Sequence, residues 1–371
     1  MSSVKTLIIA TVFLLLLLNC TVVLAAGEIT EQPLSIKEDS GKLYVGYDSW
    51  KIRVFDSSDL KLLNTFTSQA RFIASVETDD DNIYYGTDVS YTMNTSVITV
   101  ITKEGQNVSS KEGTDFFLSI LVNDGKFYDC QRYGDVEVRS VPDLKVLAKA
   151  NNSGFCTSVR VDDNYIYSAS EKRILVWGKG NLSKVAEITA HTGRIRALWD
   201  DNERIYSISD DNTLKIWNKT GFALLGTQNL KNPWTLTGHG NYLYTTSNRD
   251  IVALNRDGDI ITTMNSGGAS SVYNLYATDK ALYAANDDGT VRAWDTKTFN
   301  NTVTSQVFQY TPAKYQQLGL IQIVSYALLA VGIVGFVAMT IRGRRKKKKA
   351  ASAAAAIPPA GQSPAGPAGQ P

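Results

Sequence analysis

Side chains that commonly carry out enzyme chemistry are scarce in this sequence, which has two histidines and three cysteines among 371 residues. The metalloprotease HExxH, the nucleophile elbow GxSxG, the Walker phosphate loop and a paired CxxC are all absent. These absences disfavour metal-dependent, serine-dependent and nucleotide-dependent catalysis. We therefore expect no catalytic residue, no cofactor and no metal site.

Cysteine is also too rare for a disulfide scaffold. Cys20 lies in an N-terminal apolar run, which leaves Cys130 and Cys156 for the rest of the chain. These two either form a disulfide in an oxidising compartment or remain two small buried thiols. The residues alone leave both alternatives open, and we favour the unpaired one.

The chain has no large excess of one charge, because 38 Lys and Arg accompany 36 Asp and Glu. The cations are unevenly placed, since Lys5 and the seven in residues 342–349 lie near the two ends. Without these eight, 30 basic residues accompany 36 acidic ones, a net charge of about −6 for the central segment. Such a segment has no basic patch, so we expect no nucleic-acid partner.

Uncharged segments near the two ends predict targeting and anchoring. Residues 1–26 have the pattern of a secretory signal peptide, and residues 318–341 carry no charge over 24 positions, long enough for a transmembrane helix. The basic run at 342–349 (RGRRKKKK) is typical of a cytoplasmic stop-transfer segment. Residues 312–317 form a linker, and residues 350–371 a disordered Ala/Pro/Gly-rich tail. We expect a single-pass cell-membrane protein with its N-terminal domain outside and its C-terminus cytoplasmic.

One short pattern recurs along the middle of the chain: a turn rich in Asp, Asn and Gly, an apolar–tyrosine pair, and then an alternating strand. The seven pairs, which we call the anchor pairs, are Leu43-Tyr44, Ile83-Tyr84, Phe127-Tyr128, Ile166-Tyr167, Ile205-Tyr206, Leu243-Tyr244 and Leu282-Tyr283. They are 40, 44, 39, 39, 38 and 39 residues apart, which leaves room for four short strands in each interval. The pattern predicts an all-β, seven-bladed β-propeller over residues 28–311, followed by one transmembrane α-helix. Whether the segment EITEQ (28–32) closes the last blade is left open.

Residues 190–218 (AHTGRIRALWDDNERIYSISDDNTLKIWN) carry the clearest resemblance to a known family. His191, Ser207, Asp211 and Trp217 stand at the places of the structural tetrad of the WD-repeat family, and Asp288 with Trp294 give the seventh repeat a partial tetrad. In that family these side chains hydrogen-bond to one another between the inner strands. Other repeats depart from the pattern, and DIVALNRDGDII at 250–261 is closer to quinoprotein-type propeller repeats. The resemblance implies the fold and leaves function open, because propellers host many activities.

Aromatic and basic residues gather where the inner strands of the propeller are expected to begin, and such residues dominate binding hot spots. The candidate binding face comprises Arg71, Phe72, Asp115, Phe116, Phe155, Arg194, Trp234 and Tyr273. In WD-repeat propellers this face often receives partners. We therefore expect a protein partner, and another membrane protein is one form that it could take.

Two features have an ordinary structural interpretation beside a functional one. Acidic residues crowd the turns before the anchor pairs, where they suit either tight-turn geometry or a site for a cation or a basic partner. N-x-S/T sequons, which are candidate glycosylation sites, occur at Asn94, Asn107, Asn151, Asn181, Asn218 and Asn300.

These patterns together predict a cell-envelope protein whose external propeller is a protein-interaction or ligand-binding scaffold. The alternative is a propeller enzyme of the hydrolase, lyase or oxidoreductase type. Its active site would lie at the mouth of the central channel, where carboxylates from several blades could converge.

Overall fold

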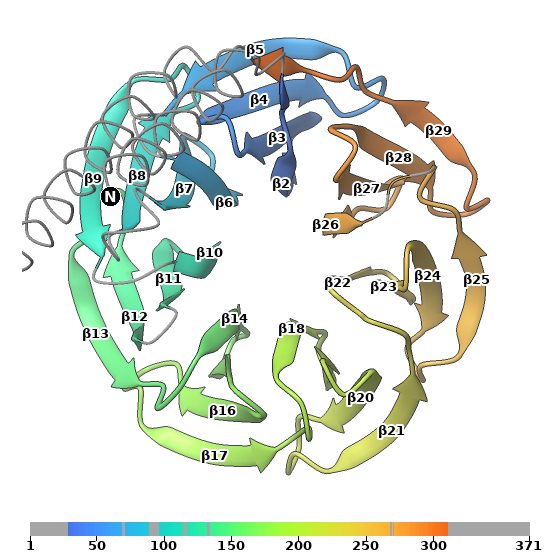
Figure 1. The fold of residues 1–371 in the computed structure, drawn as a ribbon. Coiled ribbons are helices and arrows are strands. Elements are labelled where there is room, and N and C mark those ends of the chain that lie inside the picture. Colours follow the sequence, from blue (N-terminus) through green and yellow to red (C-terminus); the bar gives the residue numbers. More distant parts are fainter. Residues whose placement is uncertain are drawn as a thin grey trace, which may run out of the picture. The chain divides into compact units, whose positions relative to one another are not determined.

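The computed structural model describes residues 29–68, 71–88, 96–113, 117–131, 134–267, 269 and 271–310. Thr30–Tyr310 belong to one compact unit. Its strands form seven four-stranded sheets arranged around a central channel (Figure 1). The fold is therefore a seven-bladed β-propeller, as the repeat spacing predicted.

Each blade consists of four consecutive antiparallel strands, with the first strand innermost and the fourth outermost. In blades 1 to 3 the strands are β2 (Pro33–Asp39), β3 (Lys42–Tyr47), β4 (Lys51–Asp56), β5 (Leu62–Thr67); β6 (Arg71–Thr78), β7 (Asn82–Asp88), β8 (Ser96–Thr102), β9 (Asn107–Gly113); and β10 (Phe117–Asn123), β11 (Lys126–Gln131), β12 (Asp135–Ser140), β13 (Val146–Asn151). In blades 4 and 5 they are β14 (Cys156–Val161), β15 (Tyr165–Ser170), β16 (Arg173–Gly178), β17 (Lys184–Thr189); and β18 (Ile195–Asp200), β19 (Arg204–Ser209), β20 (Thr213–Asn218), β21 (Leu224–Asn229). In blades 6 and 7 they are β22 (Leu236–His239), β23 (Tyr242–Ser247), β24 (Asp250–Asn255), β25 (Ile260–Met264); and β26 (Val272–Ala277), β27 (Ala281–Asn286), β28 (Val291–Asp295), β29 (Asn301–Thr304).

The anchor pairs lie in the second strand of every blade, and none of the seven anchor tyrosines is more than 3% exposed. The described residues form seven hydrophobic clusters, each shared by two neighbouring blades. In one of them, Ile205 and Trp217 of blade 5 pack with Tyr167 and Val176 of blade 4. Because each cluster needs both neighbours, the apolar faces are fully buried only when the ring is closed.

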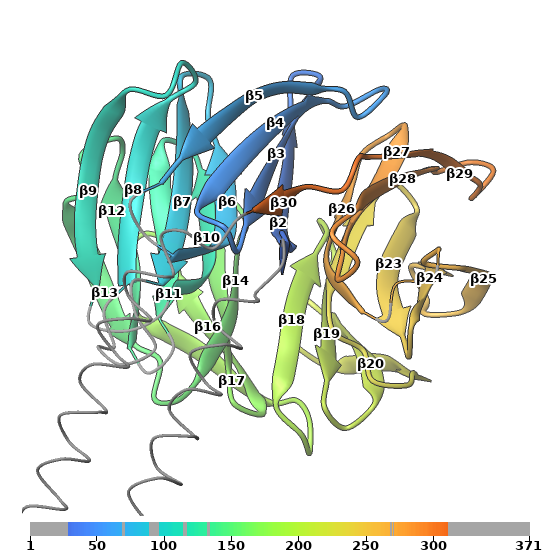
Figure 2. The same cartoon turned by 45° about the horizontal axis from the view of Figure 1, so that its top comes forward.

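Ring closure does not use the N-terminal segment as a strand of blade 7, which has four strands of its own. Two short strands, β1 (Ile29–Thr30) and β30 (Gln309–Tyr310), instead pair with each other. The backbone N–H of Glu31 donates to the carbonyl of Phe308 at 2.9 Å, and Figure 2 shows β30 lying next to blade 1. The first and last segments of the propeller therefore pair in a two-stranded sheet that is separate from the seven blades.

Charged and aromatic side chains reinforce this join. The Glu31 side chain is fully buried and forms ion pairs with Arg53 and with Lys51, the latter at 2.6 Å. The Arg53 guanidinium lies 3.7 Å from the centroid of the Phe308 ring and 4.6 Å from that of Tyr47. We call Glu31, Lys51, Arg53 and Phe308 the terminal clasp. It links the chain before blade 1 to the chain after blade 7.

Cys130 of β11 and Cys156 of β14 form a disulfide, with their Cα atoms 5.8 Å apart. The unpaired alternative that we favoured from the sequence is therefore wrong. Both residues are fully buried in the cluster between blades 3 and 4. The bond joins the second strand of one blade to the inner strand of the next, a link that a spacing of 26 residues does not reveal by itself.

Several sequence predictions fall outside the described residues. These are the signal peptide at 1–26, the linker at 312–317, the transmembrane helix at 318–341, the basic run at 342–349 and the tail at 350–371. Within the part of the chain that the structure describes, no helix is long and apolar enough to cross a membrane.

Candidate partner-binding site at the channel mouth

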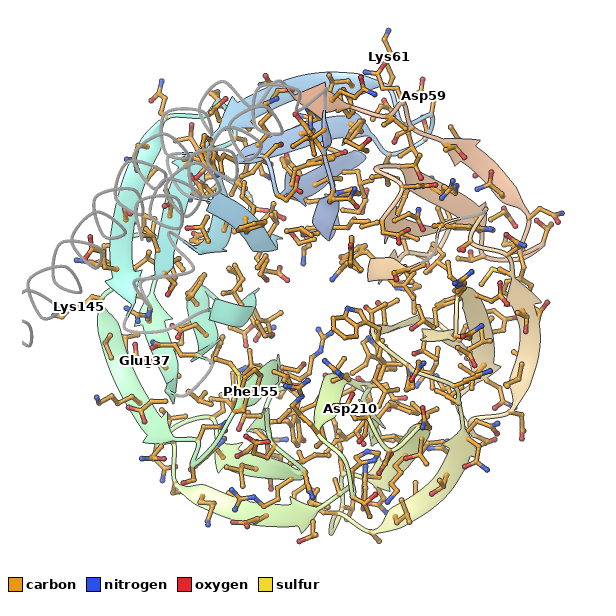
Figure 3. All side chains as sticks on the ribbon, in the orientation of Figure 1. Asp59, Lys61, Glu137, Lys145, Phe155 and Asp210 are labelled. Carbon is orange, nitrogen blue, oxygen red and sulfur yellow. A yellow bond between two sulfur atoms is a disulfide. The ribbon has the colours of Figure 1, made fainter. Side chains whose placement is uncertain are left out.

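The central channel contains a cavity of about 660 Å³, lined by the inner strands of all seven blades. The end of the channel at which the inner strands begin is its mouth. Phe155, Arg194, Trp234 and Tyr273 from the predicted binding face all line the cavity. In Figure 3, Phe155 lies on the inner side of blade 4, and Asp210 lies in the neighbouring blade 5.

Arg196 organises one part of the mouth. Its guanidinium lies 4.3 Å from the centroid of the Trp234 ring, and its Nε donates a hydrogen bond to Asp210. Trp234 is 49% exposed although it is held on one side by this cation, and its backbone N–H donates to Thr246 Oγ1 at 2.8 Å. A large aromatic ring fixed in place yet open to solvent is the kind of group that anchors protein interfaces.

Arg194 organises the adjoining part. Its guanidinium lies 5.1 Å from the centroid of the Phe155 ring, and its Nε lies 3.5 Å from Asp210 Oδ2. Asp210 therefore contacts both arginines, one on each carboxylate oxygen. We call Phe155, Arg194, Arg196, Asp210 and Trp234 the mouth cluster. The mouth cluster carries a net positive charge, because it contains two arginines and one carboxylate.

The remaining residues of the predicted binding face are Arg71, Phe72, Asp115, Phe116 and Tyr273. Tyr273 is half-buried, and its pKa is raised by burial and by the nearby carboxylates of Asp287 and Asp48. Phe72 lies in β6 with a φ of 40°, and Arg71 is the first residue of that strand. Asp115 and Phe116 lie outside the described residues.

The structural tetrad of blade 5 adjoins the mouth cluster in the chain, because Asp211 follows Asp210 in the turn between β19 and β20. Trp217 Nε1 donates to Ser207 Oγ at 3.0 Å, Ser207 lies 2.8 Å from His191 Nε2, and His191 Nδ1 lies 3.0 Å from Asp211 Oδ2. Burial lowers the pKa of His191 although the charge of Asp211 opposes it. A neutral His191 that donates from Nδ1 and accepts at Nε2 completes the relay. The relay fixes the turn that carries Asp210, the residue before Asp211.

Blade 4 has a variant of this relay that the sequence analysis missed. Trp177 Nε1 donates to Ser168 Oγ at 2.9 Å, and Ser168 donates to Asn152 Oδ1 at 2.6 Å. Asn152 takes the place of the histidine, and its amide donates onward to the Ala169 carbonyl at 3.4 Å. Its offset of 16 residues before the serine, the same as that of His191 before Ser207, was the available signal.

Blade 7 keeps less of the tetrad. Ala284 stands where blade 5 has Ser207, so the relay to Trp294 has no hydroxyl at that point. Asp288 accepts hydrogen bonds from the backbone N–H and hydroxyl of Thr290, at 3.0 and 2.6 Å, and forms an ion pair with Arg292. These contacts stabilise the turn between β27 and β28 without a histidine.

In the acidic turns at the opposite end of the channel, carboxylates accept hydrogen bonds within the turn or form ion pairs with nearby cations. Asp162 accepts hydrogen bonds from two backbone N–H groups of its turn and from the Tyr167 hydroxyl, the last at 2.7 Å. Lys219 of the next blade contacts both Asp162 and Asp200, at 2.7 and 2.8 Å. Three other cations likewise form an ion pair with a carboxylate of the preceding blade: Lys103 with Asp39, Lys179 with Asp124 and Arg256 with Asp201.

These contacts support the tight-turn interpretation of the acidic residues. Asp162 caps its own turn, and Asp39, Asp124, Asp162 and Asp201 each pair with a cation from the next blade, so these carboxylates also help to hold adjacent blades together. Across the described ranges, no group of three or more His, Cys, Asp or Glu side chains is placed to hold a metal ion.

The sequons have a similar structural role. Asn151, Asn181 and Asn218 each accept a hydrogen bond at Oδ1 from the backbone N–H of the residue two positions later, which is the Ser or Thr of the sequon. This is the geometry of an Asx-turn, and it accounts for these residue types without a glycan. Asn107 and Asn300 are exposed, and Asn94 lies outside the described residues. Glycosylation stays a prediction.

Known proteins resemble this chain in one repeat and in the overall fold. Residues 182–218 match the family model "WD domain, G-beta repeat". Two Arabidopsis thaliana proteins, zinc finger CCCH domain-containing proteins 48 and 63, are each 25% identical over 146 residues, which is 36% of this chain. The match spans about a third of the length of these relatives, 32% and 31% respectively.

Solved structures support the architecture at low sequence identity. The WD40 β-propeller domain of Doa1 is 16% identical with a TM-score of 0.61, and the match covers 73% of this chain and 97% of that domain. The computationally designed Ika8 protein is 15% identical with a TM-score of 0.60, over 76% of this chain and 90% of its own. At these identities the likeness extends to the fold alone. WD40 propellers typically act as protein-interaction scaffolds and are generally not enzymes.

Proposed function

We propose that this chain is a membrane-anchored interaction scaffold that binds a protein partner through the mouth cluster. The observation that carries the proposal is Trp234, which is 49% exposed and held in place by the Arg196 guanidinium 4.3 Å away. A preordered aromatic group loses little conformational freedom when a partner covers it. The matched WD40 repeat at residues 182–218 contains Arg194, Arg196 and Asp210, so the cluster is built on the part of the chain that most resembles that class of scaffold.

The charge of the mouth cluster indicates the chemistry of the partner. Arg194 and Arg196 share the single carboxylate of Asp210, and their side chains remain 33% and 23% exposed. We expect the partner to present an acidic group beside an apolar pocket that accepts the Trp234 ring. Association should then slow as the ionic strength rises, because exposed charges are screened beyond about 8 Å in physiological salt.

The location of the protein is part of the same proposal. The signal-peptide pattern of residues 1–26 and the apolar sequence of residues 318–341 support a single span with the propeller outside the cell. The propeller ends at Tyr310 in β30, so seven residues remain before Leu318, a reach of at most about 25 Å. Such a short connection favours a partner that is itself held at the membrane.

Cross-linking mass spectrometry on membranes that contain the full-length protein tests the partner face. Trp234→Ala combined with Arg196→Ala should reduce the captured partner about 30-fold, the loss expected for a hot spot worth about 2 kcal/mol. Leu225→Ala is the matched control, because Leu225 is an apolar residue of β21 with 53% exposure on the outer rim. Equal capture by the double variant and the control would contradict the proposal.

Membrane insertion has its own test. The protein should stay in the pellet after alkaline extraction, and a C-terminal epitope should become accessible to protease only after the membrane is permeabilised. Release of the protein by alkaline extraction, or an epitope that is accessible from outside, would contradict the proposed topology.

A further inference from the structure

One level of the central channel is lined by one side chain from each blade. These residues pair across the hairpin with the seven anchor tyrosines and so occupy equivalent places in the seven inner strands. They are Lys37, Glu77, Leu121, Arg160, Trp199, Thr237 and Tyr276. All seven also line the channel cavity. We call this set the channel ring.

The charges of the channel ring are not balanced. Lys37 Nζ forms an ion pair with Glu77 Oε2 at 2.7 Å, and these two charges cancel. Arg160 has no carboxylate within 4.0 Å among the residues that the structure describes. Its Nε donates to the Leu198 carbonyl at 2.8 Å, which orients the guanidinium. Asp200 is close enough to interact with the charge of Arg160, but its direct ion pair is with Lys219. An arginine that lines a cavity without a counter-ion is a candidate anion site.

The nearest carboxylates are committed to other cations. Asp200 is held by Lys219 at 2.8 Å, and Glu77 by Lys37 at 2.7 Å. Burial and the charge of Arg160 lower the pKa of Lys37. The interactions of Lys37 with Glu77 and Tyr276 raise it, and the pKa is raised on balance. Lys37 of blade 1 and Arg160 of blade 4 both line the channel, but Glu77 cancels the charge of Lys37, so Arg160 is the cation of the ring that would attract an anion.

Hydroxyl groups lie on the inner strands next to Arg160. Ser119 Oγ accepts a hydrogen bond from the backbone N–H of Val159 at 3.2 Å, and Ser158 Oγ accepts one from the backbone N–H of Leu198 at 3.2 Å. Both serines line the cavity. Because each hydroxyl oxygen is fixed as an acceptor, its hydrogen remains available to donate to a ligand in the channel.

We propose that the channel ring binds a small organic carboxylate, held by a two-pronged hydrogen bond from the terminal NH₂ groups of Arg160 and by the hydroxyls of Ser119 and Ser158. The cavity of about 660 Å³ suits a small molecule. Cys156 and Arg160 pair with Ser170 and Tyr167, which are three residues apart on β15, so Arg160 lies about 10 Å below the mouth at 3.3 Å per residue. At that depth a free small molecule reaches Arg160 more easily than a side chain of a protein docked at the mouth. This site uses none of the residues of the mouth cluster, although both line the same cavity.

Citrate, a simple polycarboxylate, is the probe for this site. Isothermal titration calorimetry on the purified full-length protein should give a dissociation constant of about 1 mM or below. Citrate should also change the fluorescence of Trp199, the neighbour of Arg160 in the ring. Arg160→Gln should weaken binding about tenfold or more, since it removes both the charge and the fork. Arg173→Gln is the matched control, because it removes an arginine of the same blade that forms an exposed pair with Glu187.

Two further variants protect the test against a folding defect in Arg160→Gln. Arg160→Lys keeps the charge but not the fork and should weaken citrate binding about fivefold, and Ser158→Ala should weaken it about threefold. No heat at about 10 mM citrate, or equal affinity in the Arg160 variants and Arg173→Gln, would overturn the proposal. Tighter, Arg160-dependent binding of a short Glu-containing peptide would overturn the assignment to a free small molecule.

Discussion

Replacing Arg53 with alanine should weaken the terminal clasp, which joins the two ends of the propeller. The change leaves the fully buried Glu31 carboxylate with Lys51 as its remaining cation, at 2.6 Å. Removing one partner of a buried ion pair costs about 3 to 5 kcal/mol, and the lower value applies here because Lys51 stays. Loss of the contact with the Phe308 ring, 3.7 Å from the guanidinium, adds about 1 kcal/mol. The free energy of unfolding should therefore fall by about 4 kcal/mol, which corresponds to about 10 °C in Tm.

Thermal unfolding of the full-length protein, followed by circular dichroism, measures this loss. Arg173→Ala is the control, because its partner Glu187 is 34% exposed and a surface pair contributes at most about 1 kcal/mol. Arg53→Lys should lie between the two, since it keeps a cation but loses the planar fork. If Arg53→Ala unfolds within about 2 °C of Arg173→Ala, the clasp does not hold the ring closed and the reasoning fails.

The pH dependence of the same variants adds a second test. Burial alone would raise the pKa of Glu31, but hydrogen bonds and charges from Arg53 and Lys51 outweigh it and hold that pKa below its usual value. The stabilisation is therefore present above the unfolded pKa of about 4.5 and is lost as the pH falls through the lower folded pKa. The stability difference between wild type and Arg53→Ala should shrink in acid.

Three other substitutions test separate parts of the structure. Burial raises the pKa of Asp48 to about 6, so its carboxyl favours folding fully below the unfolded value of 3.8 and has lost that contribution once the pH has risen through 6. The wild type should lose stability relative to Asp48→Asn between about pH 4 and pH 6 and change little relative to it above that range, and parallel melting profiles would contradict this. Gly238→Ala would bring a Cβ within 2.7 Å of the Trp199 ring and should lower the free energy of unfolding, measured in urea, by about 1 to 3 kcal/mol. Gly180→Ala is the control, because a Cβ there would have nothing within 4 Å and should leave the stability unchanged. Equal effects of the two substitutions would contradict the close packing of Gly238 against Trp199. Cys156→Ser should cost about 3 kcal/mol, because the disulfide closes a loop of 26 residues, and an unchanged midpoint would show that this bond does not constrain blades 3 and 4.

The repeat was readable because each blade needs the same local chemistry. A tight turn requires Asp, Asn or Gly, and the buried anchor strand requires an apolar residue beside a tyrosine, so both recur about every 40 residues. The tetrad of blade 5 could be read for the same reason, since its four residues stand at fixed offsets. Asn152 was missed because it keeps the offset of His191 but not its residue type.

Contacts between distant segments left no comparable signal. The terminal clasp joins Glu31 to Arg53 and Phe308, and nothing in the local sequence marks these residues as partners. The mouth cluster was found in part, because Arg194 and Trp234 stand out among polar neighbours. Arg196 was overlooked, and its role follows only from its position over the Trp234 ring, on another blade. The channel ring likewise depends on hairpin register, which the sequence does not give.

Site-specific photo-cross-linking tests the central claim most directly. A photoreactive amino acid in place of Trp234 should join the full-length protein in its native membrane to one defined partner, identified by mass spectrometry. The same amino acid in place of Leu225, which is 53% exposed on the outer rim of blade 5, should capture little of that partner. Adducts with the same partner at equal yield from both positions, or from position 225 alone, would show that the mouth cluster is not the binding face.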